Sequence, residues 1–326
     1  MKISQKKAAE TRHSEIIEKN GLLSKAMSGE VICNFGSQLD VEGCEDAFKD
    51  KVYRCHKRAN IEPLVAGDQV LWQHSEPYGI VIARKPRSSE ILRPDSRGRI
   101  RSMAANIDCI AIVFACAPKP QCNLIDRYLV AAEAQHVRPV LILNKIDLLK
   151  DQHASEIQVL TKDYQSIGYR IIKVSAKTGE GMPMLEKYLS NRMVIFSGQS
   201  GVGKTSLLNY LMPSANSPVS ALSSKTNHGA HTTAASRLYR LKSGGKLIDS
   251  PGIRDFSLNH LDKKNIIENF IDFQPFLGHC KFRDCTHRDE ASCALLSAVR
   301  EDLIISKRLE SYHKIMDSLQ DIKAQR

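Results

Sequence analysis

The sequence has no apolar segment long enough to span a membrane. Its longest uninterrupted apolar run, residues 109–117, is about half of the ~20 residues that a transmembrane helix needs. The first seven residues also lack the apolar core of a secretory signal peptide. From these absences we expect a soluble cytoplasmic protein that does not bind membranes.

The sequence also lacks the even, regular cysteine pattern of a disulfide-stabilised protein. It has nine cysteines, and six of them are scattered along the first half of the chain, which favours reduced thiols. The other three, Cys280, Cys285 and Cys293, lie close together near the C-terminus. This clustering is typical of a metal site.

Acidic residues are outnumbered, with 36 Asp and Glu against 47 Lys and Arg, a net charge of +11. This excess of positive charge favours an anionic partner such as nucleic acid, although it says nothing about the fold. The length of 326 residues and the apolar content of 42% exclude a disordered chain and a single small domain.

The pattern along the chain predicts four parts. Residues 1–29 form a basic flexible tail, and residues 30–104 contain short alternating apolar segments that predict a small β-barrel. The stretch 84–101 has seven basic residues and two acidic ones, so it is either a solvated loop or a phosphate-binding face. Across residues 105–272, strands and helices alternate as in a parallel sheet, whose phosphate ligands bind beyond the carboxyl ends of the strands. Residues 273–326 form a short C-terminal unit.

A complete P-loop motif follows a predicted strand and opens a predicted helix. Residues 198–205 match G-x-x-x-x-G-K-[ST] without a mismatch, so a chance glycine-rich turn is the weaker interpretation. The backbone amides of such a loop bind the β-phosphate, Lys204 bridges the β- and γ-phosphates, and Thr205 binds Mg²⁺. This loop alone does not decide between ATP and GTP. The nucleotide-binding candidates are Gly198, Gln199, Ser200, Gly201, Val202, Gly203, Lys204, Thr205 and Ser206.

Two further motifs at strand ends favour guanine. In the N-K-x-D motif at 144–147, the Asp147 carboxylate can accept hydrogen bonds from guanine N1 and its exocyclic amine, groups that adenine does not offer. The backbone amide of Ala176 in the S-A-K motif can bind guanine O6. The N-K-x-D motif also occurs by chance in ordinary loops, so the pair of motifs carries the prediction. The guanine-binding candidates are Asn144, Lys145, Ile146, Asp147, Ser175, Ala176 and Lys177.

A D-x-x-G motif and a threonine-rich segment complete the predicted catalytic machinery. Asp249 ends an apolar strand and is predicted to reach Mg²⁺ through water, while the Gly252 amide senses the γ-phosphate. Residues 226–233 are either an ordinary polar loop or a mobile switch that brings Thr232 or Thr233 to the metal.

The order of these motifs is unusual. Most GTPases place the P-loop first, whereas here the N-K-x-D and S-A-K motifs precede it, so the domain is circularly permuted. The segment after D-x-x-G therefore leads directly into the C-terminal unit, which can respond to the state of the nucleotide.

The C-terminal unit contains a predicted zinc site. Cys280, Cys285, His287 and Cys293 form a Cys₃His set, which is typical of a closed structural Zn²⁺ site, and His279 is a competing ligand that we rank below His287. A unit of this size needs such a site in order to fold. Its apolar stripe is expected on a helix after Ala294 that extends through Leu303 and Ile304.

Taken together, residues 31–300 resemble the ribosome small-subunit-dependent GTPase A family, the circularly permuted GTPases of bacterial 30S assembly. The resemblance implies an N-terminal OB-fold β-barrel, a central circularly permuted α/β P-loop GTPase domain and a C-terminal mainly helical zinc-binding domain. The motifs that carry it are the segments 105–108, 126–129, 144–147, 200–204, 231–233 and 249–253 and the Cys₃His set.

The resemblance further implies a monomer that binds the 30S subunit and 16S rRNA late in small-subunit maturation, alongside other assembly factors. It implies slow Mg²⁺-dependent GTP hydrolysis that the 30S particle stimulates and that times release. Ile253 stands where many GTPases have a water-orienting Gln, and in the family a switch histidine, here His231, is suspected of that role. Two alternatives remain, a permuted GTPase of the large subunit and a nucleic-acid-binding protein with a vestigial nucleotide site.

Two positions depart from the family pattern. Ala230 stands where the family commonly has Arg, which removes one expected contact, and residues 290–292 replace a frequent Pro-Gly before the last cysteine. We expect the second change to alter only the local turn.

Overall fold

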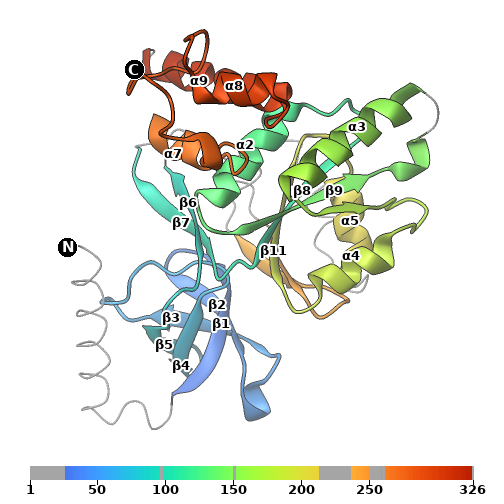
Figure 1. Cartoon of the computed structure of the whole chain (residues 1–326). Helices are drawn as coiled ribbons and strands as arrows, with labels where there is room; N and C mark the ends of the chain where they lie inside the picture. Colours follow the sequence, from blue (N-terminus) through green and yellow to red (C-terminus); the bar gives the residue numbers. More distant parts are fainter. Residues whose placement is uncertain are drawn as a thin grey trace. The chain divides into compact units, whose positions relative to one another are not determined.

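The structure, a computed structural model, describes residues 26–95, 98–149, 152–212, 236–249, 258 and 261–324. The chain divides into two compact units, residues 1–87 and residues 88–326 (Figure 1). The predicted tail lies almost entirely outside the described residues. The domain boundaries that we placed at residues 29, 104 and 272 stay predictions.

The first unit is the predicted β-barrel. Its strands pair in the order β1-β2-β3-β5-β4, and β4 pairs back with β1, so that the sheet closes on itself. Every pair is antiparallel except β3 with β5. This closed five-stranded topology is OB-like. The elements are β1 (Met27–Asn34), β2 (Gln38–Gly43), the 3₁₀ helix η2 (Asp46–Phe48), β3 (Val52–Lys57), β4 (Gln69–Gln73) and β5 (Gly79–Arg84).

Alternating side chains fill the barrel. In β4, Val70 and Trp72 are fully buried, whereas the residues on either side of them are only partly buried, as the period of two in a β-strand requires. Gly29 of β1 lies against the Trp72 ring, and a Cβ atom at this position would come within 2.7 Å of the indole. A side chain at position 29 would therefore displace the largest residue of the barrel core.

The predicted basic stretch 84–101 is partly neutralised. Arg87 donates from Nε and Nη2 to the fully buried carboxylate of Asp68, over 2.7 and 2.8 Å, and Arg84 forms an ion pair with Glu62. The chain then continues in the second unit as an antiparallel hairpin of β6 (Glu90–Pro94) and β7 (Ile100–Ala105). The stretch is therefore neither a plain solvated loop nor a continuous free basic face.

The second unit is built on a sheet with the order β10-β9-β8-β11-β13-β12, parallel except for β12. Every residue of β8 and β11 is buried, as in a parallel sheet that helices cover on both faces. The carboxyl ends of these strands meet at one edge. The strands are β8 (Cys109–Ala115), β9 (Arg138–Asn144), β10 (Ile171–Lys173), β11 (Met193–Gly198), β12 (Arg237–Arg240) and β13 (Lys246–Asp249).

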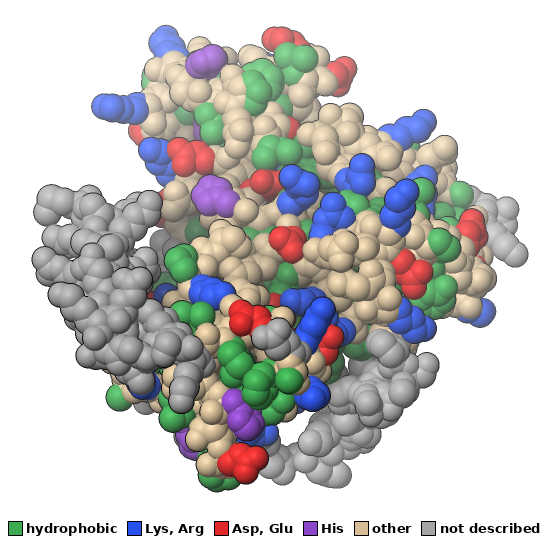
Figure 2. Space-filling view, turned by 90° about the horizontal axis from the view of Figure 1, so that it is seen from below, with side chains coloured by type: hydrophobic (Ala, Val, Ile, Leu, Met, Phe, Trp, Pro, Cys, Tyr) green, Lys and Arg blue, Asp and Glu red, His purple; other side chains and the backbone are tan. Residues whose placement is uncertain are grey.

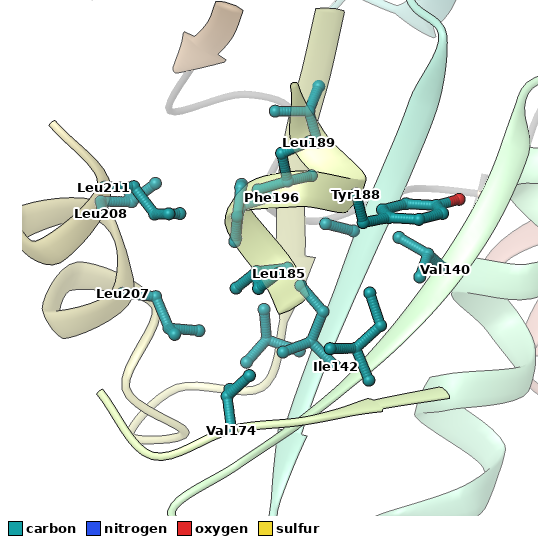
Figure 3. Close-up of a cluster of buried hydrophobic side chains, with 14 of the residues drawn as sticks. Val140, Ile142, Val174, Leu185, Tyr188, Leu189, Phe196, Leu207, Leu208 and Leu211 are labelled. Atoms are coloured by element: carbon teal, nitrogen blue, oxygen red, sulfur yellow. The ribbon is translucent and has the colours of Figure 1, made fainter. Parts of the chain in front are cut away.

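One face of this sheet carries the core that α4 and α5 cover. Leu185 and Leu189 of α4 and Leu207, Leu208 and Leu211 of α5 pack against Val140, Ile142 and Phe196 of the strands (Figure 3). Helix α2 contacts β8, β9 and β11, and α3 contacts β10. None of the helices in the described ranges is long and apolar enough to cross a bilayer. These helices are α2 (Cys122–Glu133), α3 (Gln152–Ile167), α4 (Met182–Leu189) and α5 (Lys204–Leu211), with the 3₁₀ helix η3 (Ile146–Leu148) after β9.

The C-terminal segment packs on the rest of the second unit through α9, which contacts α2. Arg308 of α9 is 3% exposed, pairs with Asp126 of α2, and binds the Asp272 carboxylate over 2.6 and 3.1 Å. Tyr164 of α3 donates to the same Asp126 carboxylate over 2.7 Å. A buried charge network of this kind fixes one arrangement of helices, because removing one partner leaves the other charge unpaired.

The helices of the C-terminal segment are short before α9. The predicted apolar stripe after Ala294 is not one helix, since α8 ends at Arg300; beyond it Leu303 is 60% exposed and Ile304 is buried, and within α8 Leu295 is buried. The elements are α7 (Lys263–Glu268), the 3₁₀ helix η4 (Gln274–Phe276), α8 (Ala294–Arg300) and α9 (Ser306–Ala324).

Candidate functional site

The candidate P-loop connects β11 to α5 at the carboxyl edge of the sheet. Gly203 has a φ of 91°, in the left-handed region that favours glycine, and a Cβ atom there would lie 2.4 Å from Asn144 Nδ2. Lys204 folds back into the loop, where its Nζ donates to the carbonyl oxygens of Gly198 and Gln199 over 2.6 and 2.7 Å. The loop thus holds its lysine ammonium where a bound phosphate would need positive charge.

Asn144 joins the three candidate nucleotide loops. Its side chain is 1% exposed, donates from Nδ2 to the Val202 carbonyl oxygen over 2.9 Å, and accepts from the Ala176 amide at Oδ1 over 3.1 Å. The N-K-x-D, P-loop and S-A-K segments therefore meet at a single buried amide. Segments that are up to 60 residues apart in the sequence are brought together because they all follow strands of one parallel sheet.

The N-K-x-D loop is held in an unusual backbone conformation. Lys145 has a φ of 62°, and its Nζ donates to the carbonyl oxygens of Ala117 and Gly201 over 2.8 and 2.7 Å. The Ala117 contact brings a fourth strand-end loop, the one after β8, into the site. Our sequence reasoning did not include this loop, although its position at the carboxyl end of β8 would have identified it.

The Asp147 carboxylate is oriented by its neighbour in the S-A-K motif. Ser175 is fully buried, and its hydroxyl donates to Asp147 Oδ1 over 2.6 Å while it accepts from the Thr178 amide over 3.1 Å. This arrangement holds one carboxylate oxygen, so that Asp147 has a fixed direction. A fixed carboxylate is what recognition of the guanine N1 and N2 groups would require.

Side chains with oxygen atoms suited to Mg²⁺ lie at or after the ends of two neighbouring strands, β11 and β13, at this edge. Thr205 and Ser206 are exposed in the first turn of α5, and Asp249 is the last residue of β13, the strand beside β11. Hydroxyl and carboxylate oxygens are the ligands that Mg²⁺ prefers. The predicted switch and catalytic residues His231, Thr232, Thr233 and Gly252 lie outside the described residues.

The four residues of the Cys₃His set converge in the C-terminal segment. The ligand atoms of Cys280, Cys285, His287 and Cys293 all lie within 4.8 Å of one another, and His279 is not among them. Cys280 Sγ is 3.9 Å from Cys293 Sγ and 3.6 Å from His287 Nδ1. A tetrahedral Zn²⁺ with ordinary bond lengths has edges of about 3.8 Å between two sulfurs and about 3.6 Å between sulfur and nitrogen. The donor set therefore fits zinc in both chemistry and size.

Glu290 organises the loop between two of these candidate ligands. Its carboxylate accepts from the Thr286 amide and hydroxyl over 2.6 and 2.7 Å and from the Arg288 amide over 3.0 Å. The Glu290 carboxylate thus anchors the loop that leads from His287 to the last cysteine, and the effect of replacing the family's frequent Pro-Gly stays a prediction.

Comparison with known proteins identifies close relatives along almost the whole chain. A family model described as RsgA GTPase matches residues 84–259. The chain is 47% identical over 311 residues to the small ribosomal subunit biogenesis GTPase RsgA of Ectopseudomonas mendocina (strain ymp), covering 95% of this chain and 90% of the relative. It is 48% identical over 292 residues to the protein of the same name from Chromohalobacter salexigens, covering 89% and 86%.

Solved structures agree with this comparison. The chain matches the crystal structure of YloQ, a circularly permuted GTPase, with a TM-score of 0.71 and 27% identity over 91% of this chain and 96% of that one. It matches YjeQ from Thermotoga maritima with a TM-score of 0.73 and 27% identity over 90% and 99%. The permuted motif order predicted from the sequence therefore has structural counterparts.

Proposed function

The chain belongs to the RsgA GTPase family, and on this premise we propose that it hydrolyses GTP on the 30S ribosomal subunit and that hydrolysis times its release late in small-subunit maturation. The observation that carries the proposal is the junction at Asn144, where the P-loop and both guanine-recognition segments share one buried amide. Relatives named for small-subunit biogenesis support the choice of ribosomal particle.

In the proposed mechanism, the P-loop amides and Lys204 bind the phosphates, and Asp147 with the Ala176 amide selects guanine. Thr205 and Asp249 would hold Mg²⁺, which supplies positive charge to the phosphate oxygens when it is bound. Ser175 keeps the Asp147 carboxylate in its orientation. The assignments of His231, Thr232, Thr233 and Gly252 to the water-positioning and switch steps remain proposals from the sequence alone.

The Cys₃His set would hold one structural Zn²⁺. A closed set of four protein ligands leaves no position for a substrate, so the ion would stabilise the C-terminal segment rather than take part in hydrolysis. The Arg308 network then joins that segment to α2 of the GTPase core.

The barrel supplies a surface that suits rRNA. Phe35 and Tyr78 are 49% and 42% exposed, the guanidinium of Arg54 lies 4.6 Å from the centre of the Phe35 ring, and the His56 ring meets Tyr78 edge to face at 4.9 Å. Exposed aromatic rings offer stacking surfaces to unpaired bases, and Arg54, whose Nε pairs with Asp40 over 2.7 Å, is 42% exposed beside one of them. We propose 16S rRNA as the ligand of this face, with the protein acting as a cytoplasmic monomer beside other assembly factors.

The experiment that tests the proposed function measures GTP and ATP hydrolysis by the purified protein alone and with equimolar 30S or 50S subunits. We expect 30S subunits to raise GTP turnover by about tenfold or more, equivalent to about 1.4 kcal/mol of transition-state stabilisation. ATP turnover is the internal control. Stimulation by 50S subunits alone would transfer the protein to large-subunit assembly, and stimulation by neither would remove the ribosomal part of the proposal.

A second prediction concerns the choice of base. Asp147→Asn is expected to lower the affinity for GTP by about 10- to 100-fold. The carboxylate accepts hydrogen bonds from two guanine donors, whereas the asparagine NH₂ group would face one of those donors with a second donor. The variant should gain affinity for XTP, whose C2 carbonyl oxygen can accept from the new amide. Competition binding against a fluorescent nucleotide measures both effects.

Asp163→Asn, the same chemical change on α3, is the matched control and should leave both affinities unchanged. An unchanged preference for GTP over XTP in Asp147→Asn would show that Asp147 does not read the base.

A further inference from the structure

A groove lies at the amino ends of the parallel strands, at the edge of the sheet opposite to the candidate nucleotide site. Its volume is about 1050 Å³, and it is lined by residues of the loops that precede β8, β9, β10 and β11, together with Tyr188 of α4. No residue of the P-loop, the guanine-recognition motifs or the Cys₃His set lines it. Its function is therefore separate from nucleotide binding and from the proposed zinc site.

The four loops at this edge share one local design. Each turns through a residue in the left-handed region and then presents a charged residue at, or one position before, the first residue of the strand. Neighbouring parallel strands are about 4.8 Å apart, so the charged residues form a row along the edge. In the strand order β10, β9, β8 and β11, the left-handed residues are Gly168, His136, Asn106 and Asn191, and the charged residues are Arg170, Arg138, Asp108 and Arg192.

Two of the three arginines in this row are available to a ligand. Arg138 and Arg170 are exposed, and neither guanidinium has a hydrogen-bond or ion-pair partner among the residues that the structure describes. The guanidinium of Arg170 lies 5.3 Å from the centre of the Tyr188 ring, and that of Arg192 lies 4.4 Å from it. A buried aromatic ring thus orients two guanidinium groups before any ligand arrives, which lowers the entropic cost of binding an anion.

The acidic residues of the groove offset this charge only in part. Asp108 accepts the backbone amide of Met193 at Oδ2 over 2.6 Å, which commits one of its oxygens to the fold. Glu133 is half-buried in the wall of the groove. Figure 2 shows Lys and Arg side chains gathered over one part of the surface, with fewer acidic ones among them. Arg138 and Arg170 therefore face solvent with incomplete neutralisation, while the partly buried Arg192, which donates to the Tyr188 carbonyl oxygen, adds its charge beside them.

We propose that this groove, defined by Arg138, Arg170 and Arg192, binds the sugar–phosphate backbone of RNA. Guanidinium groups offer paired N–H donors that match phosphate oxygens, and a row of them matches a repeating anion. Of the apolar lining residues, Val137, Tyr169 and Tyr188 are buried and only Pro139 and Ile271 are partly exposed, so the groove offers little apolar surface to anchor the side chains of a peptide. The choice of RNA among polyanions rests on the proposed ribosomal function.

The test uses a double variant, Arg138→Gln with Arg170→Gln, in the full-length protein. Binding of a fluorescent single-stranded RNA of mixed sequence is followed by anisotropy across a series of salt concentrations. We expect the Kd to rise by about tenfold and the slope of log K against log salt to fall in magnitude by about 1.4, since each single-strand phosphate contact contributes about 0.7. Basal GTP hydrolysis should not change, because neither residue belongs to the nucleotide site. The unfolding temperature should change little, because neither guanidinium makes a hydrogen bond or an ion pair among the described residues and only Arg170 meets a ring, that of Tyr188.

The matched control is Lys162→Gln with Lys173→Gln, which removes the same charge from exposed positions of the same unit; Lys173 lies at the other end of β10 from Arg170. We expect it to bind the RNA probe within about twofold of the wild type, because phosphate contacts act locally. Wild-type affinity and slope in the arginine variant, or equal losses in both double variants, would overturn the proposal. So would loss of binding to a poly-glutamate peptide in the arginine variant with RNA binding intact.

Failure of this proposal can be told apart from failure of the proposed function. If 30S subunits stimulate GTP hydrolysis but the arginine variant binds RNA normally, the proposal that the groove binds RNA is wrong and the proposed ribosomal function stands. If 30S subunits do not stimulate hydrolysis, the ribosomal function fails, and the difference between the two double variants still decides whether the groove binds RNA.

Discussion

Replacing Lys204 by alanine is expected to lower kcat for GTP hydrolysis by at least about 100-fold, the loss typical of removing one preorganised donor from a developing anion. The lysine Nζ lies 2.6 and 2.7 Å from the carbonyl oxygens of Gly198 and Gln199, inside the loop that follows β11. No other side chain of the described loop carries a positive charge that could replace it. Single-turnover hydrolysis with saturating GTP isolates this effect from weaker binding.

Lys187→Ala, at an exposed position of α4, is the control for loss of a lysine from the same domain. Both variants should unfold at the wild-type temperature. Turnover by Lys204→Ala within severalfold of the wild type would contradict the P-loop role.

Removing zinc should have the second large effect, on stability rather than on catalysis. Structural zinc contributes on the order of 10 kcal/mol to the folding of small zinc-binding units, so chelation or Cys280→Ser should unfold the region around the Cys₃His set. Between Phe276 and Ala294 the described chain forms no helix or strand, so the proposed metal is the main constraint on that loop. We expect one zinc per chain by elemental analysis, its loss in the variant, and rapid proteolysis between residues 273 and 305.

Histidine substitutions supply the matched pair for this experiment. His287→Gln should lose the metal, whereas His279→Gln should keep it, because only His287 has a ring nitrogen that converges with the three thiols. Retention of zinc by both Cys280→Ser and His287→Gln would show that the metal does not bind at this set.

The central sheet and the motif positions could be predicted from the sequence because they rest on strong local patterns. The apolar runs of β8, β9 and β11 are continuous, and each motif follows the end of a strand at the edge where phosphate ligands bind. The convergence of the P-loop, N-K-x-D and S-A-K segments follows from that topology. A link between Asn144 and the P-loop could also be expected from the N-K-x-D motif, and the structure confirms it. The hydrogen bond that Asn144 accepts from the Ala176 amide depends on side-chain positions that only the structure gives.

The barrel shows where the local pattern was insufficient. Strand β2 alternates the apolar Leu39 and Val41 with the acidic Asp40 and Glu42, yet the structure buries the two acids as well as the apolar residues. Arg54 of β3 pairs with Asp40 over 2.7 Å, and this ion pair offsets part of the desolvation cost of burying the Asp40 carboxylate. A pairing between two strands cannot be deduced from either strand alone.

The basic stretch 84–101 shows the same limit of a local pattern. A count of charges along residues 84–101 takes no account of acids elsewhere in the chain, and Asp68 and Glu62 neutralise two of its arginines. Conversely, the arginine row of the proposed RNA-binding groove was not singled out, since its members are far apart in sequence and each is an ordinary residue at the start of a strand. Charge clusters that form through a sheet edge are visible only after the strand order is known.

The strand order also has a consequence for folding of the chain during its synthesis. Synthesis delivers β8, β9 and β10 before β11, yet β11 is the partner that closes the second edge of the wholly buried strand β8. A nascent chain that has emerged only as far as residue 190 would therefore expose an apolar strand edge, the kind that associates with other chains. Because of the permutation, the fragment with the N-K-x-D and S-A-K motifs is prone to aggregate until β11, the strand before the P-loop, has left the exit tunnel. A pause of translation in this interval would favour binding of the nascent chain by a chaperone.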